Sequence, residues 1–236
     1  DAMKVEQADF VYGEGTVNPQ ITGVEGAPTF TYRERDKADA TESSTAPTDA
    51  GKYTVIATLD TENTVYTASA DFEITRKSIA GATVTLQKDD KSEATTTLEL
   101  PYTGVQQTVK VGSVTLGDKN LKTEDYTVDT NVNGTNAGQY TVTVTGKGNY
   151  TGTAQVTWKI TPATLTIQSA TLAAKTYDGT KTATVESVSF GGLVNSETLG
   201  ENDYTVTGTF DTADAGENKN VTVTVTLKDT DTAKNY

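Results

Sequence analysis

The residues of this sequence that could do chemistry are carboxylates, because the chain has no cysteine and no histidine. Without those side chains it cannot form a disulfide, a thiolate zinc site or a Ser-His-Asp triad. Acidic pairs could still bind calcium through hard oxygen ligands, or act as acid and base in glycoside hydrolysis. The closest clusters are Asp89-Asp90, Glu124-Asp125, Glu201 with Asp203, and Asp229 with Asp231.

These clusters do not have the pattern that either chemistry requires. None shows the Asp-x-Asp-x-Asp-Gly spacing of a dedicated calcium loop, which favours solvated acidic turns. Glycoside hydrolysis needs two carboxylates that face each other across a cleft at a defined separation. We therefore predict no catalytic residue, no metal ligand and no cofactor, and we do not expect an enzyme.

Three other motifs have a chemical interpretation that their context disfavours. Residues 100–104 read Leu-Pro-Tyr-Thr-Gly, which matches a sortase signal, but another strand follows instead of a hydrophobic span and a basic tail. A Lys–Asn isopeptide crosslink needs a lysine inside the core, and Lys110 and Lys159 alternate outward. Glycosylation sequons at Asn133, Asn149 and Asn220 are short motifs, and we give them little weight.

Charge and composition limit the class of partner. The chain has 32 acidic and 19 basic side chains, a net charge of −13, and a sequence pI of about 4.4. Phosphate backbones are bound by lysine and arginine, so we expect no nucleic-acid partner. The sequence is also too polar for membrane insertion, yet it has enough apolar residues for small cores.

Three copies of one template organise the chain. Each copy opens with a turn: Tyr12-Gly13, Tyr102-Thr103-Gly104 and Tyr177-Asp178-Gly179. An acidic-or-amide–Ala–Gly triplet ends 36 to 39 residues after the opening tyrosine: Asp49-Ala50-Gly51, Asn136-Ala137-Gly138 and Asp214-Ala215-Gly216. A second tyrosine closes each copy: Tyr66, Tyr150 after Asn149, and Tyr236 after Asn235.

The residues after each triplet alternate between apolar and polar types, which predicts a half-buried β-strand. The inward-facing residues are Tyr53, Val55, Ala57 and Leu59, then Tyr140, Val142 and Val144, then Val221, Val223, Val225 and Leu227. A closing strand follows in the first two copies, where Phe72 and Trp158 take the same core position. The third copy reaches Tyr236 without one, so we expect further repeats beyond it, and an exposed sheet edge that frays first.

The predicted fold class is all-β, with three tandem immunoglobulin-like antiparallel β-sandwich units stacked end to end, the third lacking its last strand. The boundaries lie near residues 77 and 162, which gives copies of residues 1–77, 78–162 and 163–236. No flexible linker separates them. The recurring tyrosines are interpreted as structural, with rings at the core edge and hydroxyls bound to backbone. Residues 36–48 form a polar insert, read as a hairpin tip or mobile loop.

The third copy resembles the YDG repeat of bacterial surface proteins. It reads Lys-Thr-Tyr-Asp-Gly-Thr at 175–180, Val-Ser-Phe at 188–190, Gly-Leu-Val at 192–194 and Asp-Ala-Gly at 214–216. The first two copies, with their Tyr-x-Gly turn, Ala-Gly-x-Tyr-Thr-Val strand and terminal Ile-Thr, resemble the related MBG repeats. The resemblance implies an immunoglobulin-like or similar sandwich at the surface of a bacterium, and it supplies no catalytic residues.

These observations lead to one expected function and one alternative. We expect a non-catalytic stalk segment of a secreted or cell-wall-attached, adhesin-like bacterial surface protein, in contact with further repeats of its own chain. The alternative is a module that binds a host or microbial glycan or protein through loops at the sandwich ends, above all the insert at residues 36–48.

Overall fold

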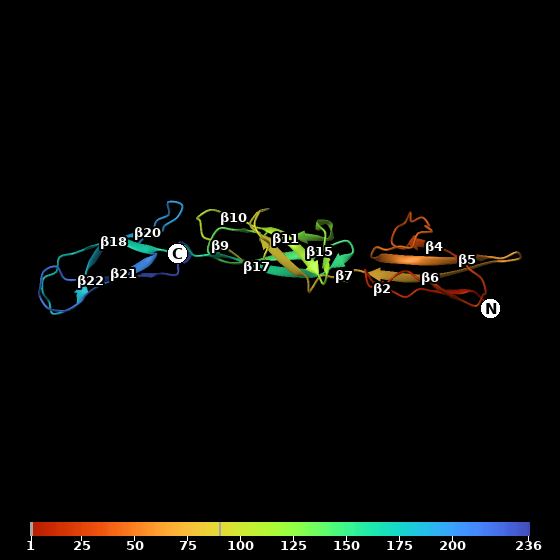
Figure 1. The fold of residues 1–236 in the computed structure, drawn as a ribbon, viewed down its shortest axis with the longest axis horizontal. Coiled ribbons are helices and arrows are strands. Elements are labelled where there is room, and N and C mark those ends of the chain that lie inside the picture. The colour runs from red at the N-terminus through yellow and green to blue at the C-terminus, as the bar shows by residue number, and fades with distance from the viewer. Residues whose placement is uncertain (1, 90) are drawn as a thin grey trace. The chain divides into compact units, whose positions relative to one another are not determined.

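The computed structural model describes residues 2–89 and 91–236. Its described residues contain no α-helix, only two short 3-10 turns, η1 (Thr123–Asp125) and η2 (Ala233–Asn235). Every other regular element is a β-strand, as Figure 1 shows. The all-β prediction is therefore confirmed. The physical reason is that β-branched residues that alternate along the chain pack well on a pleated surface.

Two compact units divide the chain by their internal contacts, and each is described by itself. Unit 1 comprises Asp1–Val84, Ser113–Asp129 and Thr143–Gln155, and unit 2 comprises Thr85–Gly112, Thr130–Val142 and Val156–Tyr236. The second copy contributes residues to both units. The predicted boundaries at residues 77 and 162, and the number of immunoglobulin-like sandwiches, remain predictions.

A four-stranded sheet in unit 1 contains most of the strand residues of the first copy. Its strand order is β2 (Phe10–Val11), β6 (Val65–Thr75), β5 (Gly51–Asp60) and β4 (Thr29–Glu34), with β4, β5 and β6 drawn in orange tones in Figure 1. β6 runs antiparallel to β5 and parallel to β2, so the closing strand lies between the opening strand and the strand after the triplet. A second pair, β1 (Lys4–Glu6) with β3 (Gln20–Thr22), is antiparallel.

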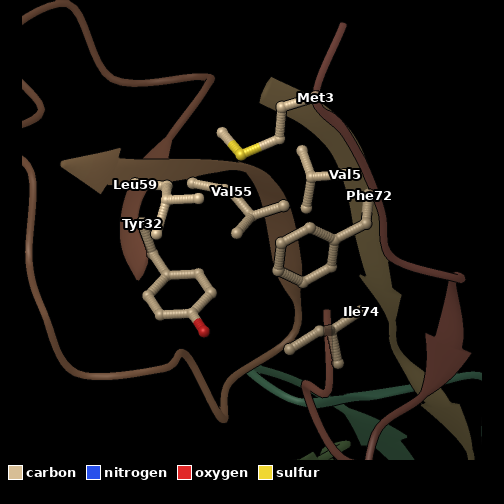
Figure 2. Close-up of a cluster of buried hydrophobic side chains, with 8 residues drawn as sticks. Met3, Val5, Tyr32, Val55, Leu59, Phe72 and Ile74 are labelled. Carbon is tan, nitrogen blue, oxygen red and sulfur yellow. The ribbon is translucent and has the colours of Figure 1, made fainter. Parts of the chain in front are cut away.

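The side chains predicted to face inward on β5 form the core of this sheet. Val55 and Ala57 are fully buried, and Leu59 is nearly so, while Tyr53 is half-buried against them. Figure 2 shows Val5, Val55 and Phe72 pointing toward one another, with Met3 and Ile74 beside them. Burial of one such side chain stabilises the fold by about 1.5–3 kcal/mol, so the closing strand, which supplies Phe72 and Ile74, is a large part of this core.

The polar insert at residues 36–48, predicted to be a hairpin tip or a mobile loop, makes an antiparallel contact that agrees with the first of these alternatives. Its middle pairs with β4, because Tyr32 and Ser43 exchange two backbone hydrogen bonds of 2.8 and 2.9 Å. Thr31 also donates its hydroxyl to Glu42, and Ala46 packs against the core. The insert therefore pairs with the open edge of β4 at Tyr32, which satisfies two backbone groups that an edge strand would leave unpaired there.

The remaining strands of unit 1 lie at the boundary between the first two copies or within the second copy. β7 (Lys77–Ser78) pairs in parallel with β16 (Tyr150–Thr151). β12 (Lys119–Asn120) pairs with residues 115–116 of β11 (Lys110–Leu116), and β13 (Tyr126–Val128) pairs with residues 144–146 of β15 (Gly138–Gly146).

The closing strand of the second copy, β17 (Thr153–Thr161), has a parallel partner in β9 (Leu98–Pro101) within unit 2. Trp158 is buried there, as predicted, stacks on Tyr140 with ring centroids 4.7 Å apart, and donates its indole N–H to the Asn131 carbonyl at 3.1 Å. β17 lies between β9 and β15 in its sheet. The other strands are β8 (Thr83–Gln87), in a sheet with β11, and the pair β10 (Gln107–Thr108) and β14 (Asn133–Gly134).

The third copy, also in unit 2, forms two small sheets. One pairs β18 (Thr166–Leu172) with β20 (Val185–Gly191), and the other has the order β19 (Thr182–Ala183), β21 (Tyr204–Phe210), β22 (Val221–Leu227). The inward valines of β22 are only half-buried, and every residue of β18 is exposed. Within the described residues no strand covers the second edge of β22, which is where the first two copies have their closing strand.

Candidate functional site at the Asn–Tyr junctions

The acidic clusters singled out by sequence lie in turns, where their carboxylates bind neighbouring groups. Asp203 accepts hydrogen bonds from the Gly200 N–H and the Thr230 hydroxyl. Asp89 accepts from Lys91 and Ser92, and the hydrogen bond from the Ser92 hydroxyl is the main reason that its pKa is lowered. Within the described ranges no three acidic side chains converge on one point that could hold a metal ion. Asp90 lies outside the described residues.

The other chemical motifs are part of the sheets. In the Leu-Pro-Tyr-Thr-Gly segment, Leu100 pairs with Ile160 on β17, and both Leu100 and Tyr102 are buried. Lys110 and Lys159 are exposed, as their alternation predicted, and Lys159 lies 3.9 Å from Glu99. Within the part of the chain that the structure describes, no helix is long and apolar enough to cross a membrane.

The contacts that repeat in this structure join one copy of the template to the next. At the first of these places, which we name the first Asn–Tyr junction, Asn149 binds the Asp49-Ala50-Gly51 triplet. Its side-chain oxygen accepts from the Ala50 N–H at 2.7 Å, and its side-chain amide donates to Asp49 at 2.9 Å. Its backbone carbonyl accepts from the Lys77 N–H at 2.9 Å. All of these residues belong to unit 1.

A pair of tyrosines completes the first junction. The ring of Tyr150 meets the ring of Tyr12 edge to face, with centroids 5.5 Å apart and an interplanar angle of 80°. The ammonium group of Lys119 lies over both rings, 5.3 and 5.4 Å from their centroids. An edge-to-face pair contributes about 0.5–1.5 kcal/mol beyond the area that it buries, and a cation over a ring about 0.5–1 kcal/mol at an exposed site.

The second Asn–Tyr junction, within unit 2, repeats this arrangement with Asn235 and Tyr236. The Asn235 side-chain oxygen accepts from the Ala137 N–H at 2.8 Å, its amide lies 3.5 Å from the side-chain oxygen of Asn136, and its carbonyl accepts from the Ala163 N–H at 2.8 Å. The ring of Tyr236 meets the ring of Tyr102 at 5.8 Å and 82°. The same contacts in the same order define one junction built twice.

The two junctions differ in the charge beside the rings. At the second junction Glu197 accepts hydrogen bonds from the hydroxyls of Tyr102 at 2.5 Å and Tyr236 at 2.7 Å. Asn195, two residues earlier, donates its amide to the Gly104 carbonyl at 3.0 Å. Burial and then the hydrogen bond to Glu197 raise the pKa of Tyr102 well above its ordinary value, and burial is the main cause that raises the pKa of Tyr236.

Alkaline pH should weaken the second junction. A raised tyrosine pKa means that the folded state holds the proton more tightly than the unfolded state. The contribution of Tyr102 is therefore complete below about pH 10, the unfolded pKa, and is lost as the pH rises further through the folded pKa. Thermal unfolding followed by near-UV circular dichroism between about pH 8 and pH 12 measures this loss. A Tyr102→Phe variant should lose less stability over the same range, and an equal loss in both proteins would contradict the assignment.

The structure corrects two interpretations of the tyrosines. The opening tyrosines do not bind backbone through their hydroxyls as a tyrosine corner would, since Tyr102 binds a carboxylate. Hydroxyl-to-backbone bonds are made by the strand tyrosines, Tyr53 to the Asp49 carbonyl and Tyr140 to the Asn136 carbonyl. The closing tyrosine Tyr236 also makes one, because its hydroxyl accepts from the Val194 N–H at 3.1 Å. Tyr66 is not the counterpart of Tyr150, because it lies within β6 opposite Leu59 and packs on the first core.

The sequence held a signal for these junctions that spacing alone could reveal. Asn149 follows Asp49 by 100 residues and Asn235 follows Asn136 by 99, so the partners recur at nearly constant separation across two copies. Lys119 and Glu197 have no such signal. Neither has an equivalent in another copy, because each lies in a segment outside the shared template. Only folding brings these two side chains to the tyrosine rings.

Comparison with known families agrees with the repeated architecture. Residues 15–78 match the MBG domain, and residues 161–236 match the YDG domain. The chain contains an MBG domain followed by a YDG domain. Among curated proteins, none matches the chain.

The match confirms the predicted order of MBG-like and YDG-like repeats. The MBG domain falls within the first copy, and the YDG domain covers the third. The MBG-like character of residues 78–162 remains a prediction. The Asn–Tyr junctions that this region makes with the MBG domain and with the YDG domain support it. These domains indicate a repeat segment of an extracellular, surface-type protein, and they are not known as enzymes.

Proposed function

We propose that this chain is a non-catalytic stalk segment of a secreted or cell-wall-attached bacterial surface protein of the adhesin type. The observation that carries the proposal is the Asn–Tyr junction, formed twice with the same donors, acceptors and ring geometry. A spacer needs joints that hold each repeat in a fixed orientation relative to the next repeat. A net hydrogen bond contributes about 0.5–1.5 kcal/mol, so three hydrogen bonds and a ring pair are enough to restrict each joint.

The acidic surface suits the same function. The net charge of −13 is spread along the sequence, and acidic side chains such as Asp36 and Asp229 form exposed ion pairs. Such a surface keeps neighbouring stalks soluble and apart. The absence of cysteine and histidine fits repeats that are held by sandwich cores and need no redox or metal chemistry.

Small-angle X-ray scattering of the full chain tests the stalk function. Strands of about ten residues at about 3.4 Å each give about 35 Å per copy, and three copies in series give a rod of about 100 Å. We expect a radius of gyration near 30 Å, whereas a compact domain of this length has roughly 17–18 Å. A value near the lower figure would exclude a stalk. A Tyr12→Ala, Asn149→Ala double variant should leave the maximum dimension similar but broaden the distance distribution, because the joint loosens.

A second candidate function is recognition of a host or microbial glycan or protein, and residues 36–48 are the observation that favours it. The insert is held on β4 by the Tyr32–Ser43 pair, so its exposed polar side chains form an ordered surface. Glycan-array and pull-down screening, with the insert deleted as the control, separates the two functions. Binding that depends on the insert supports recognition, and its absence leaves the spacer function alone.

A further inference from the structure

The second Asn–Tyr junction binds one carboxylate between its two tyrosine hydroxyls. One oxygen of Glu197 accepts from the Tyr102 hydroxyl at 2.5 Å, and the other oxygen accepts from the Tyr236 hydroxyl at 2.7 Å. These lengths are typical of hydrogen bonds from a hydroxyl to an ionised carboxylate, which are about twice as strong as neutral ones. The hydroxyls of this ring pair are therefore a pair of donors whose spacing matches the two oxygens of a carboxylate.

The first junction holds its ring pair in the same geometry. The rings of Tyr12 and Tyr150 lie 5.5 Å apart at 80°, against 5.8 Å and 82° at the second junction. The backbone of the opening tyrosine is also fixed in the same way. The Tyr12 N–H donates to the Thr75 carbonyl, and the Tyr102 N–H donates to the Thr161 carbonyl, both at 2.9 Å. The hydroxyls of Tyr12 and Tyr150 are therefore expected to form a second pair of donors.

The hydroxyl of Tyr150 is buried without an acceptor for its proton. Tyr150 is 1% exposed, and its hydroxyl is a buried polar group for which the described residues supply no acceptor. The corresponding hydroxyl of Tyr236 donates to Glu197. A buried donor that lacks an acceptor costs stability, because water would bind it in the unfolded chain. Any acceptor that reaches this hydroxyl therefore gains a hydrogen bond at little cost to the fold.

A cation lies beside this hydroxyl, where the second junction has its carboxylate. The ammonium group of Lys119 is 5.3 and 5.4 Å from the two ring centroids, and its interaction with the Tyr150 hydroxyl is the main cause that raises the pKa of Lys119. An ammonium group has three donors and no acceptor, so it cannot take the hydroxyl proton. Asp125, whose charge also acts on Lys119, accepts from the Lys122 N–H at 2.9 Å. The first junction therefore gathers two hydroxyls and an ammonium group, all of them donors to an anion.

The position of Lys119 leaves a ligand a way in from solvent. Lys119 is exposed on the short strand β12, and its four-carbon stem is flexible. The ammonium group can therefore move outward from the rings and still pair with an anion that lies between it and the hydroxyls. The rings themselves need not move, because the backbone bonds of Tyr12 and Asn149 fix them.

We propose that the first Asn–Tyr junction binds a carboxylate ligand, which takes the place that Glu197 holds at the second junction. One ligand oxygen accepts from the Tyr150 hydroxyl, the other accepts from the Tyr12 hydroxyl, and the Lys119 ammonium group pairs with the anion from the solvent side. A free monocarboxylate and the carboxylate of an acidic sugar share this chemistry. The proposal does not rest on the stalk function, because a spacer and a recognition module would have the same donors at this junction.

Titration of the full chain with sodium acetate, followed by NMR of the backbone amides, tests this site. Acetate should shift the Lys119 and Tyr150 amides with saturation, at a dissociation constant of about 1–10 mM, while the Ala137 amide at the second junction stays unchanged. At saturating acetate, hydrogen exchange of the Ala50 amide should slow by about 3-fold or more, because the ligand binds the closed junction. Sodium chloride at the same ionic strength should cause neither change.

A parallel titration with sodium glucuronate separates the two sources of the carboxylate. If glucuronate binds about 10-fold or more tightly than acetate, the ligand is an acidic sugar whose ring makes further contacts. If the two bind within about 3-fold of each other, the site recognises the carboxylate group alone.

Four variants show whether the named groups form the site. Lys119→Met removes the ammonium group, Tyr150→Phe removes the buried hydroxyl, and each should weaken acetate binding by about 10-fold or more. Lys119→Glu supplies a carboxylate within the chain, so the first junction should no longer respond to acetate. Glu197→Lys should transfer the response to the Ala137 amide at the second junction.

Three results would overturn the proposal. The first is a set of shifts that grow without saturation, the second is an equal response to chloride, and the third is unchanged acetate binding in both Lys119→Met and Tyr150→Phe. The wild-type titrations leave the protein unaltered, so they decide the question even if a variant fails to fold.

Discussion

Replacing Trp158 with alanine should lower the free energy of unfolding of the second copy by about 3–5 kcal/mol, the largest effect that we expect from one substitution. Trp158 is 1% exposed, stacks on Tyr140 and donates to the Asn131 carbonyl. Its removal leaves a cavity and takes away the indole hydrogen bond to Asn131, and both costs add to the lost transfer free energy. Hydrogen exchange of amides in β15 and β17 measures the change.

The adjacent residue supplies the control for this substitution. Lys159 is exposed, and its ion pair with Glu99 spans 3.9 Å, so Lys159→Ala should change the same free energy by less than about 0.5 kcal/mol. If Trp158→Ala cost under about 1 kcal/mol, the closing strand would not be central to this core.

Replacing Asn149 with aspartate should lower the free energy needed to open the first Asn–Tyr junction by about 1–2 kcal/mol. The new carboxylate still accepts from the Ala50 N–H, but it faces Asp49, to which the Asn149 amide donates at 2.9 Å. A favourable hydrogen bond becomes a repulsion between like charges. Exchange of the Ala50 and Lys77 amides should become about 5- to 30-fold faster, and Trp158 should keep its buried fluorescence.

A second substitution should reverse this effect. Asp49→Asn in the Asn149→Asp chain restores a donor opposite the carboxylate and recreates, with the roles exchanged, the amide that the second junction has at Asn136. Protection of the Ala50 N–H should return to within about 3-fold of its original value. If the double variant stays as open as Asn149→Asp, the Asp49–Asn149 contact is not what holds the two copies together.

The Asn–Tyr junctions show why some contacts could be anticipated and others could not. A tyrosine opens the first and the second copy, at Tyr12 and Tyr102, and an asparagine stands near the end of the second and the third, at Asn149 and Asn235. Their structural importance was therefore visible as a pattern. Their partners were not visible, because the asparagine of one copy binds the triplet of the preceding copy about 100 residues earlier. Periodicity describes neighbours along a strand, and a contact between copies depends on how their ends meet.

The same limit explains what the structure added to two further interpretations. Composition left residues 36–48 as either a hairpin tip or a mobile loop, because backbone pairing leaves no trace in side-chain type, and two backbone hydrogen bonds join Ser43 to β4. Tyr66 shares its residue type with Tyr150, yet it lies inside β6 because the strand of the first copy starts earlier. The residue type limits which contacts a side chain can make, and the pairing register of its strand decides which neighbours it contacts.

The sequence by itself determined the all-β class, the threefold template, the inward faces of the strands and the order of MBG-like and YDG-like repeats. The class, the template and the inward faces follow from alternation and from turn residues, which act over a few positions, and the order of the repeats follows from the family resemblance of their motifs. Only the tertiary structure decided that Lys119 lies over one tyrosine pair and that Glu197 binds the other. Those features depend on long-range packing, which unites residues that no local pattern relates.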